Sequence, residues 1–194
     1  MRDDRNDPFD GLPPTLRQVA EVAGIEAAAG LPVLDLPLIE VDLPAPCPNA
    51  VYEARIGAAT RALLAEGVRD WVFGDLFLAD IRAYREAQLA PLGIRAHFPL
   101  WGSDTGTLAR EMLAAGIDAH LVTLDPRHLP AGRCGTAFDA SFLDTLPAGV
   151  DPCGERGEFH TVVSYAPGFA RRLELRRGET VTREGVVYTD FTLA

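Results

Sequence analysis

The sequence contains no lysine, because all 18 of its basic residues are arginines. This excludes a Walker-type phosphate-binding loop, and it excludes enzymes that use a lysine to form a Schiff base or to attach pyridoxal phosphate. The sequence also has no Gly-Gly pair. A GC-rich genome produces an arginine-only, alanine-rich composition too, so the missing lysine by itself identifies no function.

Cysteines are few, and long apolar runs are missing. Cys47, Cys134 and Cys153 are far apart and form no Cys-x-x-Cys pair, so we expect neither a disulfide framework nor a zinc ribbon. The first ten residues are dominated by Asp and Arg, and no apolar run reaches transmembrane length. We therefore expect a cytoplasmic protein without a membrane partner.

Basic residues are outnumbered by acidic ones, which gives a net charge of −10 and a pI near 4.8. Binding of nucleic acid is not expected, because it requires a basic surface. The 194 residues, 47% hydrophobic and 24% charged, suit one globular domain with a sizeable core. Assembly into homo-oligomers stays open.

Apolar periodicity predicts an α/β protein. Strands are expected at residues 31–43, 70–74, 95–100 and 118–125. Helices are expected at residues 15–29, 49–66 (with Asn49 as the N-cap), 80–89, 105–115 and 139–146. Such alternation is typical of a mostly parallel sheet with crossover helices.

After Pro152 the pattern changes to strands without intervening helices. These strands are expected at residues 159–165, 171–176 and 186–193, with turns at residues 167–168 and at Gly185. We therefore predict a flexible leader over residues 1–14, an α/β domain over residues 15–150 and a small antiparallel β subdomain over residues 151–194.

The densest chemistry lies in residues 151–161, Asp-Pro-Cys-Gly-Glu-Arg-Gly-Glu-Phe-His-Thr. This stretch, here called the acidic loop, places three carboxylates, a thiol, an imidazole and a hydroxyl around two glycines. Glycines let the backbone turn sharply or approach a ligand, and a loop that feeds a strand is a common binding site. The same residue types are also ordinary turn material that is only solvated.

In a parallel sheet, ligands bind outside the carboxyl ends of the strands. Three loops are expected at that edge, at residues 74–75, 99–102 and 125–126. Gly74 would let a ligand reach the backbone, and Trp101 could stack on a planar ligand. Asp75 is equally typical of a helix N-cap, and Trp101 of a residue that covers the core.

Three stretches together resemble the diphthine–ammonia ligase family of ATP pyrophosphatases, in the adenine nucleotide alpha hydrolase superfamily. They are Gly74-Asp75 with Asp80-Ile81-Arg82 and Arg85-Glu86, then Pro99-Leu100-Trp101-Gly102, and finally the acidic loop. They occur in family order and at family-like spacing. The family pattern Gly-Glu-x-Gly-Glu-(Phe/Tyr)-His-Thr would rarely occur by chance, so this motif is quite specific.

The resemblance implies a Rossmann-like (HUP-type) fold that adenylates a small-molecule or protein carboxylate with ATP and Mg²⁺, after which ammonia displaces AMP. Glu155, Glu158 and His160 would be catalytic, since a carboxylate can orient an amine and an imidazole can move its proton. Gly74 and Asp75 would lie beside the nucleotide. The residues implied to contact the acceptor substrate or brace its cleft are Asp80, Arg82, Glu86, Trp101, Asp151, Cys153, Gly154, Gly157 and Thr161.

The sequence departs from the family at its beginning. The family opens with a strand and a Ser-Gly-Gly-Lys-Asp-Ser loop that holds the ATP phosphates, and this sequence contains no such loop. Its beginning aligns best with the family's second helix, so we expect an N-terminally truncated sheet. Two hypotheses follow: an ATP-dependent amide-forming protein with its acceptor site retained, or a non-catalytic relative that binds a small molecule or a protein without ATP turnover.

Two other kinds of chemistry are disfavoured. A serine hydrolase is not expected, because none of the serines, Ser103, Ser141 and Ser164, lies in a Gly-x-Ser-x-Gly motif. Cys153 is more typical of a structural cysteine than of a nucleophile. Together with Glu158 and His160 it has no recognised metal-ligand spacing, so no metal site is predicted.

Overall fold

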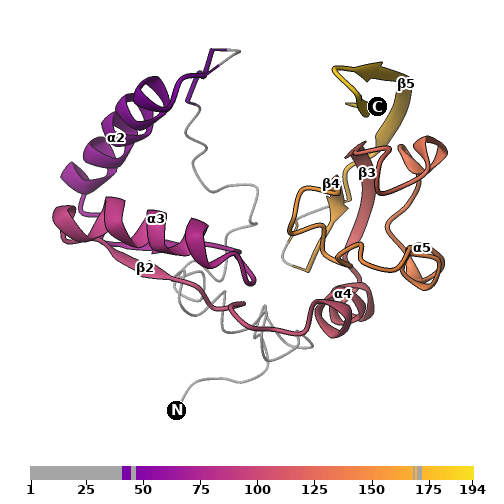
Figure 1. The fold of residues 1–194 in the computed structure, drawn as a ribbon, viewed down its shortest axis with the longest axis horizontal. Helices are drawn as coiled ribbons and strands as arrows, with labels where there is room; N and C mark the ends of the chain where they lie inside the picture. The colour runs from indigo at the N-terminus through magenta and orange to yellow at the C-terminus, as the bar shows by residue number, and fades with distance from the viewer. Residues whose placement is uncertain (1–40, 45–46, 168, 170–171) are drawn as a thin grey trace.

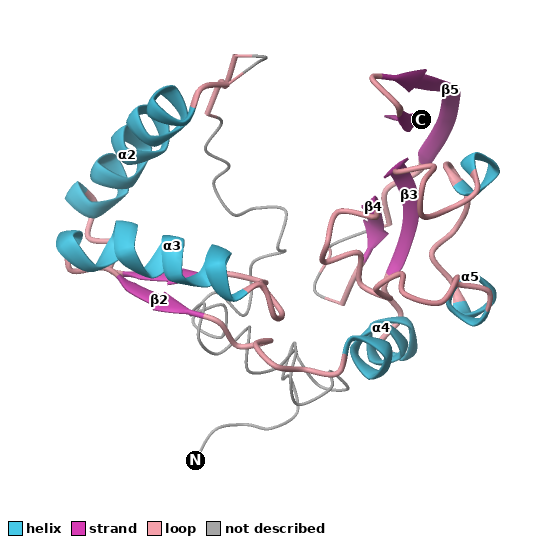
Figure 2. Ribbon diagram, in the orientation of Figure 1, coloured by secondary structure: helices cyan, strands magenta, loops and turns pink. Residues whose placement is uncertain are grey.

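The computed structural model describes residues 41–44, 47–167, 169 and 172–194. The predicted leader, the predicted helix at residues 15–29 and most of the predicted strand at residues 31–43 lie outside this range. Residues 49–97 and residues 105–193 form two groups of elements (Figures 1 and 2). No helix in the described part of the chain is long and apolar enough to cross a membrane.

The first group is a βαβ unit preceded by a helix. Its elements are helix α2 (Asn49–Ala65), strand β1 (Asp70–Val72), helix α3 (Ala79–Leu89), the 3-10 turn η3 (Ala90–Leu92) and strand β2 (Arg95–His97). Strands β1 and β2 are parallel, with Trp71 opposite Ala96. The predicted crossover is therefore confirmed.

Three predicted boundaries in this group are wrong. Strand β1 ends at Val72 instead of residue 74. Pro48, not Asn49, is the N-cap of α2, because Pro48 has an extended backbone and Asn49 already lies in the helix. Strand β2 ends at His97, and residues 98–102 turn instead of continuing to residue 100. The turn follows Phe98 and contains Pro99, whose ring removes a strand hydrogen-bond donor.

The second group contains helices α4 (Thr105–Ala114) and α5 (Ala140–Asp144), the 3-10 turn η4 (Ala131–Arg133) and four strands. The strands are β3 (Asp118–Leu124), β4 (Phe159–Tyr165), β5 (Leu175–Arg183) and β6 (Val186–Leu193). They form one antiparallel sheet in the order β4-β3-β6-β5. Both helices begin at a side-chain cap: Asp104 accepts from the backbone N–H of Thr107, and Asp139 from that of Phe142, each at 2.8 Å.

The prediction that residues 118–125 extend the parallel series is wrong. Strand β3 pairs antiparallel with β4, where Leu121 lies opposite Thr161, and with β6, where Leu124 lies opposite Val187. Apolar alternation identifies a strand but not its partner. The described residues therefore form a two-stranded parallel sheet and a separate four-stranded antiparallel sheet.

The predictions after Pro152 fare better. Strands β4 and β6 have the predicted bounds, whereas β5 begins at Leu175 instead of residue 171 and runs on to Arg183. Strands β5 and β6 form a hairpin whose two turn residues, Glu184 and Gly185, have φ of 50° and 82°. Two consecutive positive φ values are typical of the type I′ turn that matches strand twist, so the predicted turn at Gly185 is confirmed.

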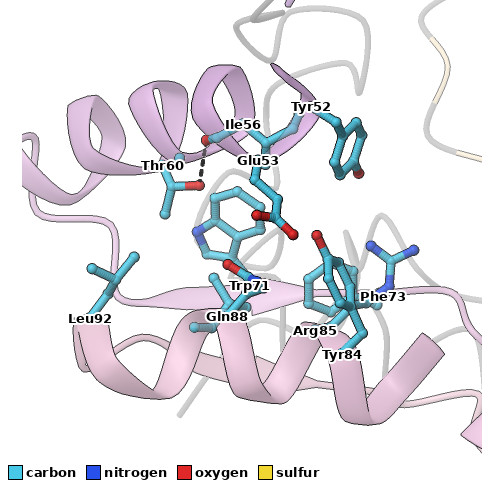
Figure 3. A pocket seen from close by; sticks show the side chains of 12 residues that line it. Tyr52, Glu53, Ile56, Thr60, Trp71, Phe73, Tyr84, Arg85, Gln88 and Leu92 are labelled. Carbon is cyan, nitrogen blue, oxygen red and sulfur yellow. Dashed lines mark hydrogen bonds between the residues drawn. The ribbon is translucent and has the colours of Figure 1, made fainter. Parts of the chain in front are cut away.

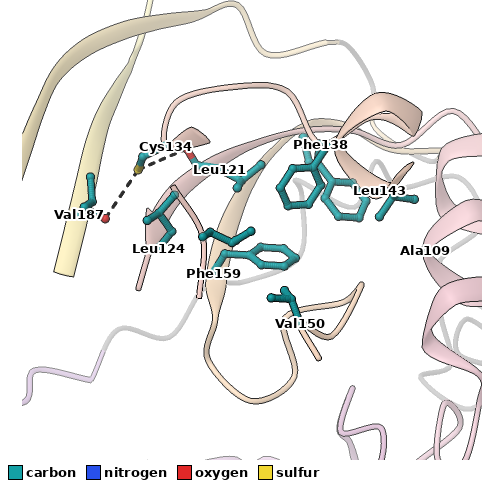
Figure 4. Packing of buried hydrophobic residues seen from close by; sticks show 12 residues of the cluster. Ala109, Leu121, Leu124, Cys134, Phe138, Leu143, Val150, Phe159 and Val187 are labelled. Carbon is teal, nitrogen blue, oxygen red and sulfur yellow. Dashed lines mark hydrogen bonds between the residues drawn. The ribbon is translucent and has the colours of Figure 1, made fainter. Parts of the chain in front are cut away.

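The described hydrophobic core lies against the antiparallel sheet, where α4, α5 and the strands converge (Figure 4). An aromatic cluster is at its centre: the ring of Phe142 packs edge-on against that of Phe159 at 5.2 Å between centroids, and Phe138 contacts both. Leu121 and Leu124 of β3 are fully buried beside them. The core therefore anchors Phe159, which is the first residue of β4 and part of the acidic loop.

A substitution at Gly135 would test how the antiparallel sheet is packed. It has φ of 81°, and a Cβ there would lie 2.4 Å from Nε of Arg177 and 2.8 Å from Cγ2 of Thr189. We expect Gly135→Ala to lower the free energy of unfolding in urea by about 2 kcal/mol or more, because it adds backbone strain and a clash. The control is Gly132→Ala, where a Cβ meets nothing within 4 Å; an equal loss in both variants would contradict the described packing.

Candidate functional site

The acidic loop connects the core to strand β4, and an open pocket of ≈ 390 Å³ lies beside it. The pocket is lined by Cys153, Gly154, Glu155, Gly157, Phe159, His160 and Thr161. Six of these seven residues were singled out in the sequence. The structure thus brings the predicted residues of the loop together, but it gives them different tasks.

Asp151 organises the first half of the loop. Its side chain is buried, and Oδ1 accepts from the backbone N–H groups of Cys153 at 2.9 Å and Glu155 at 3.3 Å. Its other oxygen, Oδ2, accepts from the hydroxyl of Thr105 at 2.8 Å. Because a buried carboxylate needs several donors, these contacts fix the loop against the start of α4.

Glu158 organises the second half. It is only 2% exposed, and its two oxygens accept from the backbone N–H groups of Asp151 at 2.9 Å and Arg156 at 3.0 Å. The guanidinium of Arg156 is 3.9 Å away. Glu158 does not line the described pocket, so its carboxylate holds the loop closed on itself instead of facing a ligand there.

Two glycines of the loop have left-handed backbones. Gly154 has φ of 69°, and a Cβ there would lie 2.7 Å from the carbonyl oxygen of Phe159. Gly157 has φ of 82° with no atom near its absent Cβ. Gly154 is therefore required by both conformation and close approach, and Gly157 by conformation alone.

Glu155 links the loop to the first group of elements. Its Oε1 accepts from the backbone N–H of Leu76 at 2.7 Å. The same residue, Leu76, is buried, and its carbonyl accepts from the backbone N–H of Gly102 at 2.8 Å. Glu155 therefore lines the pocket while tying it to the loops that follow β1 and β2.

His160 and Thr161 are exposed at the start of β4 and line the pocket. His160 lies opposite Thr123 of β3, so its backbone is held by the sheet while its imidazole stays accessible. An accessible imidazole that lines the same pocket as the Glu155 carboxylate can hydrogen-bond a ligand there and exchange a proton with it.

Cys153 is held as a thiol. Its Sγ donates to the backbone carbonyl of Thr105 at 3.4 Å. Burial, followed by the nearby charges of Asp151, Glu155 and Asp104, raises the pKa of the Cys153 thiol to about 12. A thiol with so high a pKa is a poor nucleophile, which favours the structural interpretation of this residue.

Gly74 and Asp75 follow β1 but do not line the pocket. Gly74 is exposed, with open space where a Cβ would lie. Asp75 is largely buried, and its Oδ2 lies 2.9 Å from Nε of Arg85. Their contact with a nucleotide stays a prediction; what the structure shows is that Leu76, the next residue, contacts Glu155.

The predicted bracing residues lie along α3 and after β2. The guanidinium of Arg82 lies 4.7 Å from the ring centroids of both Phe98 and Trp101, and its Nε donates to Glu86 at 2.9 Å. Asp80 is exposed in the first turn of α3. Trp101 packs edge-on against Phe98. This contact is compatible with both predicted roles of Trp101, covering the core and stacking on a ligand. None of these side chains lines the pocket.

Asp125 was expected at the same sheet edge as Gly74, and this is wrong because β3 belongs to the other sheet. Hydrogen bonds from the side chain and backbone of Arg127 lower the pKa of Asp125 to about 2. The backbone N–H of Asp125 donates to the carbonyl of Glu158 at 3.0 Å. Asp125 thus holds the backbone of the acidic loop at Glu158 through this hydrogen bond.

One contributor to the site escaped the sequence analysis. Thr105 binds both Asp151, through its hydroxyl, and Cys153, through its carbonyl. In the sequence it is only the first residue of a predicted helix, and nothing marks its contact with a loop 46 residues later. Among the described residues, no group of three or more His, Cys, Asp or Glu side chains is placed to hold a metal ion.

Comparison with protein families gives one match in this region. Residues 104–191 match a family model described as the diphthamide synthase C-terminal domain. The matched range begins at the cap of α4 and contains the acidic loop, the pocket and the antiparallel sheet except for the last two residues of β6. It confirms the predicted resemblance to the diphthine–ammonia ligase family for this part of the chain. No curated protein matches the chain.

We expect Glu158→Gln to weaken the loop. The amide nitrogen of Gln is a donor, so one of the two backbone N–H groups now bound by Glu158 would face another donor in a buried place. The free energy of unfolding should fall by about 1–3 kcal/mol in urea denaturation. Glu111→Gln, a partly exposed change on α4, serves as the control, and a Glu158→Gln protein as stable as this control would contradict the loop-holding role.

The cysteines should differ in reactivity. At pH 8, iodoacetamide should label Cys47, whereas the fully buried Cys134 should react only in denaturant. Cys153 is partly exposed like Cys47 but has a raised pKa, so it should react much more slowly than Cys47. Because the folded pKa of Cys153 is raised, its contribution to stability is complete below its unfolded pKa of about 9 and is lost as pH rises towards 12. Cys153→Ala should reduce this alkaline loss; labelling of native Cys153 as rapid as that of Cys47 would contradict its raised pKa.

Proposed function

Because residues 104–191 match a family model described as the diphthamide synthase C-terminal domain, we propose that this protein is a diphthine–ammonia ligase-like, amide-forming protein whose pocket beside the acidic loop is the acceptor-substrate site. One observation carries the proposal: within the matched region, Glu155 and His160 line one open pocket. The proposal includes a Rossmann-like arrangement for the part that contains β1 and β2.

The roles of the loop residues follow from their contacts. Glu155 would bind the ammonium form of the attacking nitrogen, since one of its oxygens is used by Leu76 and the carboxylate still faces the pocket. His160 would accept a proton from that nitrogen, which frees the lone pair that attacks the acyl carbon. Glu158 and Asp151 would act by positioning the loop, because their oxygens are bound to backbone and hydroxyl donors.

The described residues around this pocket do not fit an ATP triphosphate. No arginine lines the pocket. The two arginines of α3 are engaged, Arg82 with Glu86 and Arg85 with Asp75, and Arg156 of the acidic loop lies over the ring of Phe77. Phosphates need converging cations or backbone N–H groups at a helix start. Adenylation by ATP and Mg²⁺ therefore requires phosphate-binding groups beyond those that line this pocket, and we derive no step through them.

This misfit favours a second candidate function, a relative that binds a carboxylate, an amine or a protein segment in the pocket without turning over ATP. The sequence supports it because it contains no lysine for the family's phosphate loop. The two functions share one pocket and differ only in whether AMP and pyrophosphate are released.

Incubation with ATP, ammonia and a panel of carboxylates tests the first function. We expect release of AMP and pyrophosphate that depends on both the carboxylate and ammonia. His160→Ala should lower the rate about 100-fold or more, the usual contribution of a proton-transferring side chain. His128→Ala, an exposed change outside the pocket, should not.

The other outcomes are informative too. Calorimetric binding of a carboxylate or an ammonium salt, weakened by Glu155→Gln and without pyrophosphate release, would establish the binding function instead. A protein that neither binds these compounds nor turns over ATP would contradict both functions.

A further inference from the structure

A second pocket, of ≈ 70 Å³, lies between helices α2 and α3 and strand β1 (Figure 3). It shares no residue with the pocket beside the acidic loop. Its lining is Tyr52, Glu53, Ile56, Gly57, Thr60, Trp71, Phe73, Tyr84, Arg85, Gln88, Leu89 and Leu92. Nothing in the family match covers this region, which ends before residue 104.

Aromatic rings form much of its wall. Tyr52 comes from α2, Trp71 and Phe73 lie at β1, and Tyr84 comes from α3, so three separate elements present rings to one space (Figure 3). Rings that surround a cavity from several sides attract cations through their negative faces, and this is how proteins bind ammonium groups.

A carboxylate completes the wall. Figure 3 shows the Glu53 carboxylate directed into the pocket, towards the Tyr84 hydroxyl. Tyr84 is exposed at the edge of the pocket, and partial desolvation, followed by the negative charge of Glu53, raises its pKa, so the phenol stays neutral beside the carboxylate. Glu53 is exposed at the edge of the pocket, and it forms no ion pair with any other residue that the structure describes. The pocket therefore offers one negative charge among neutral rings.

Arg85 also lines the pocket, but its charge is matched elsewhere. Its guanidinium lies 4.4 Å from the ring centroid of Phe73, and its Nε lies 2.9 Å from Oδ2 of Asp75. The Arg85 guanidinium therefore covers the ring of Phe73. The side chains of Tyr52, Trp71, Tyr84 and Glu53 are left to contact a ligand. The remaining set is anionic and aromatic.

We propose that this pocket binds the ammonium group of a small organic cation, a primary or methylated amine. The small volume suits one head group, since it is about half that of a cavity of about 150 Å³ known to hold benzene. Trp71 and Tyr84 provide ring faces and Glu53 provides the opposite charge. The proposal is independent of the function proposed for the other pocket.

Fluorescence of Trp71 tests this directly, because the protein has only two tryptophans and the other, Trp101, lies outside the pocket. In a Trp101→Phe background, methylammonium, tetramethylammonium and choline chlorides are titrated against NaCl at equal ionic strength. We expect a saturable change in Trp71 emission with at least one ammonium salt. The uncharged analogue of choline, 3,3-dimethylbutan-1-ol, should give none.

Two variants separate the parts of the site. Glu53→Gln should raise the dissociation constant about tenfold or more, and Tyr84→Leu should raise it as well, while Glu66→Gln, the same change at the exposed end of α2, should leave it unchanged. Far-UV circular dichroism checks that each variant is folded. No saturable change, equal binding of the neutral analogue, or equal binding by folded Glu53→Gln would overturn the proposal.

Discussion

Two buried carboxylates determine the shape of the candidate site. Asp151 and Glu158 lie seven residues apart, and Oε1 of Glu158 accepts from the backbone N–H of Asp151 itself. Between them they bind three further backbone N–H groups and the hydroxyl of Thr105. A buried charge is costly unless it is fully hydrogen-bonded, so the loop has one conformation in which these donors converge. The pocket-lining residues are placed by that conformation.

This constraint also relates the site to the rest of the chain. Phe159, the residue after Glu158, is packed against Phe138 and Phe142 in the core, so the turns of residues 151–158 end at a fixed point. Glu155 then reaches the Leu76 backbone, which in turn binds Gly102. A chain of hydrogen bonds thus runs from the core of the antiparallel sheet to the loops that follow the parallel strands, and a ligand at Glu155 would contact its centre.

The sequence predicted the contents of the site better than its organisation. The residue types of the acidic loop marked the pocket, and alternation gave the bounds of β4 and β6, because these features depend on local sequence. Whether Glu158 faces a ligand or the backbone depends on burial, which one sequence does not reveal. The partner of β3 and the contact from Thr105 depend on residues far along the chain, so neither periodicity nor motif could locate them. The aromatic pocket between α2, α3 and β1 is likewise assembled from residues whose spacing carries no pattern.

Amide hydrogen exchange at Asp151 and Arg156 examines the central constraint most directly, because these N–H groups bind the Glu158 carboxylate. If the carboxylates hold the loop, both amides should exchange as slowly as those of the neighbouring strand β4, although they lie in a loop with two glycines. Exchange as fast as in an unstructured peptide would show that Glu158 is not bound there, and the proposed acceptor site would lose its support.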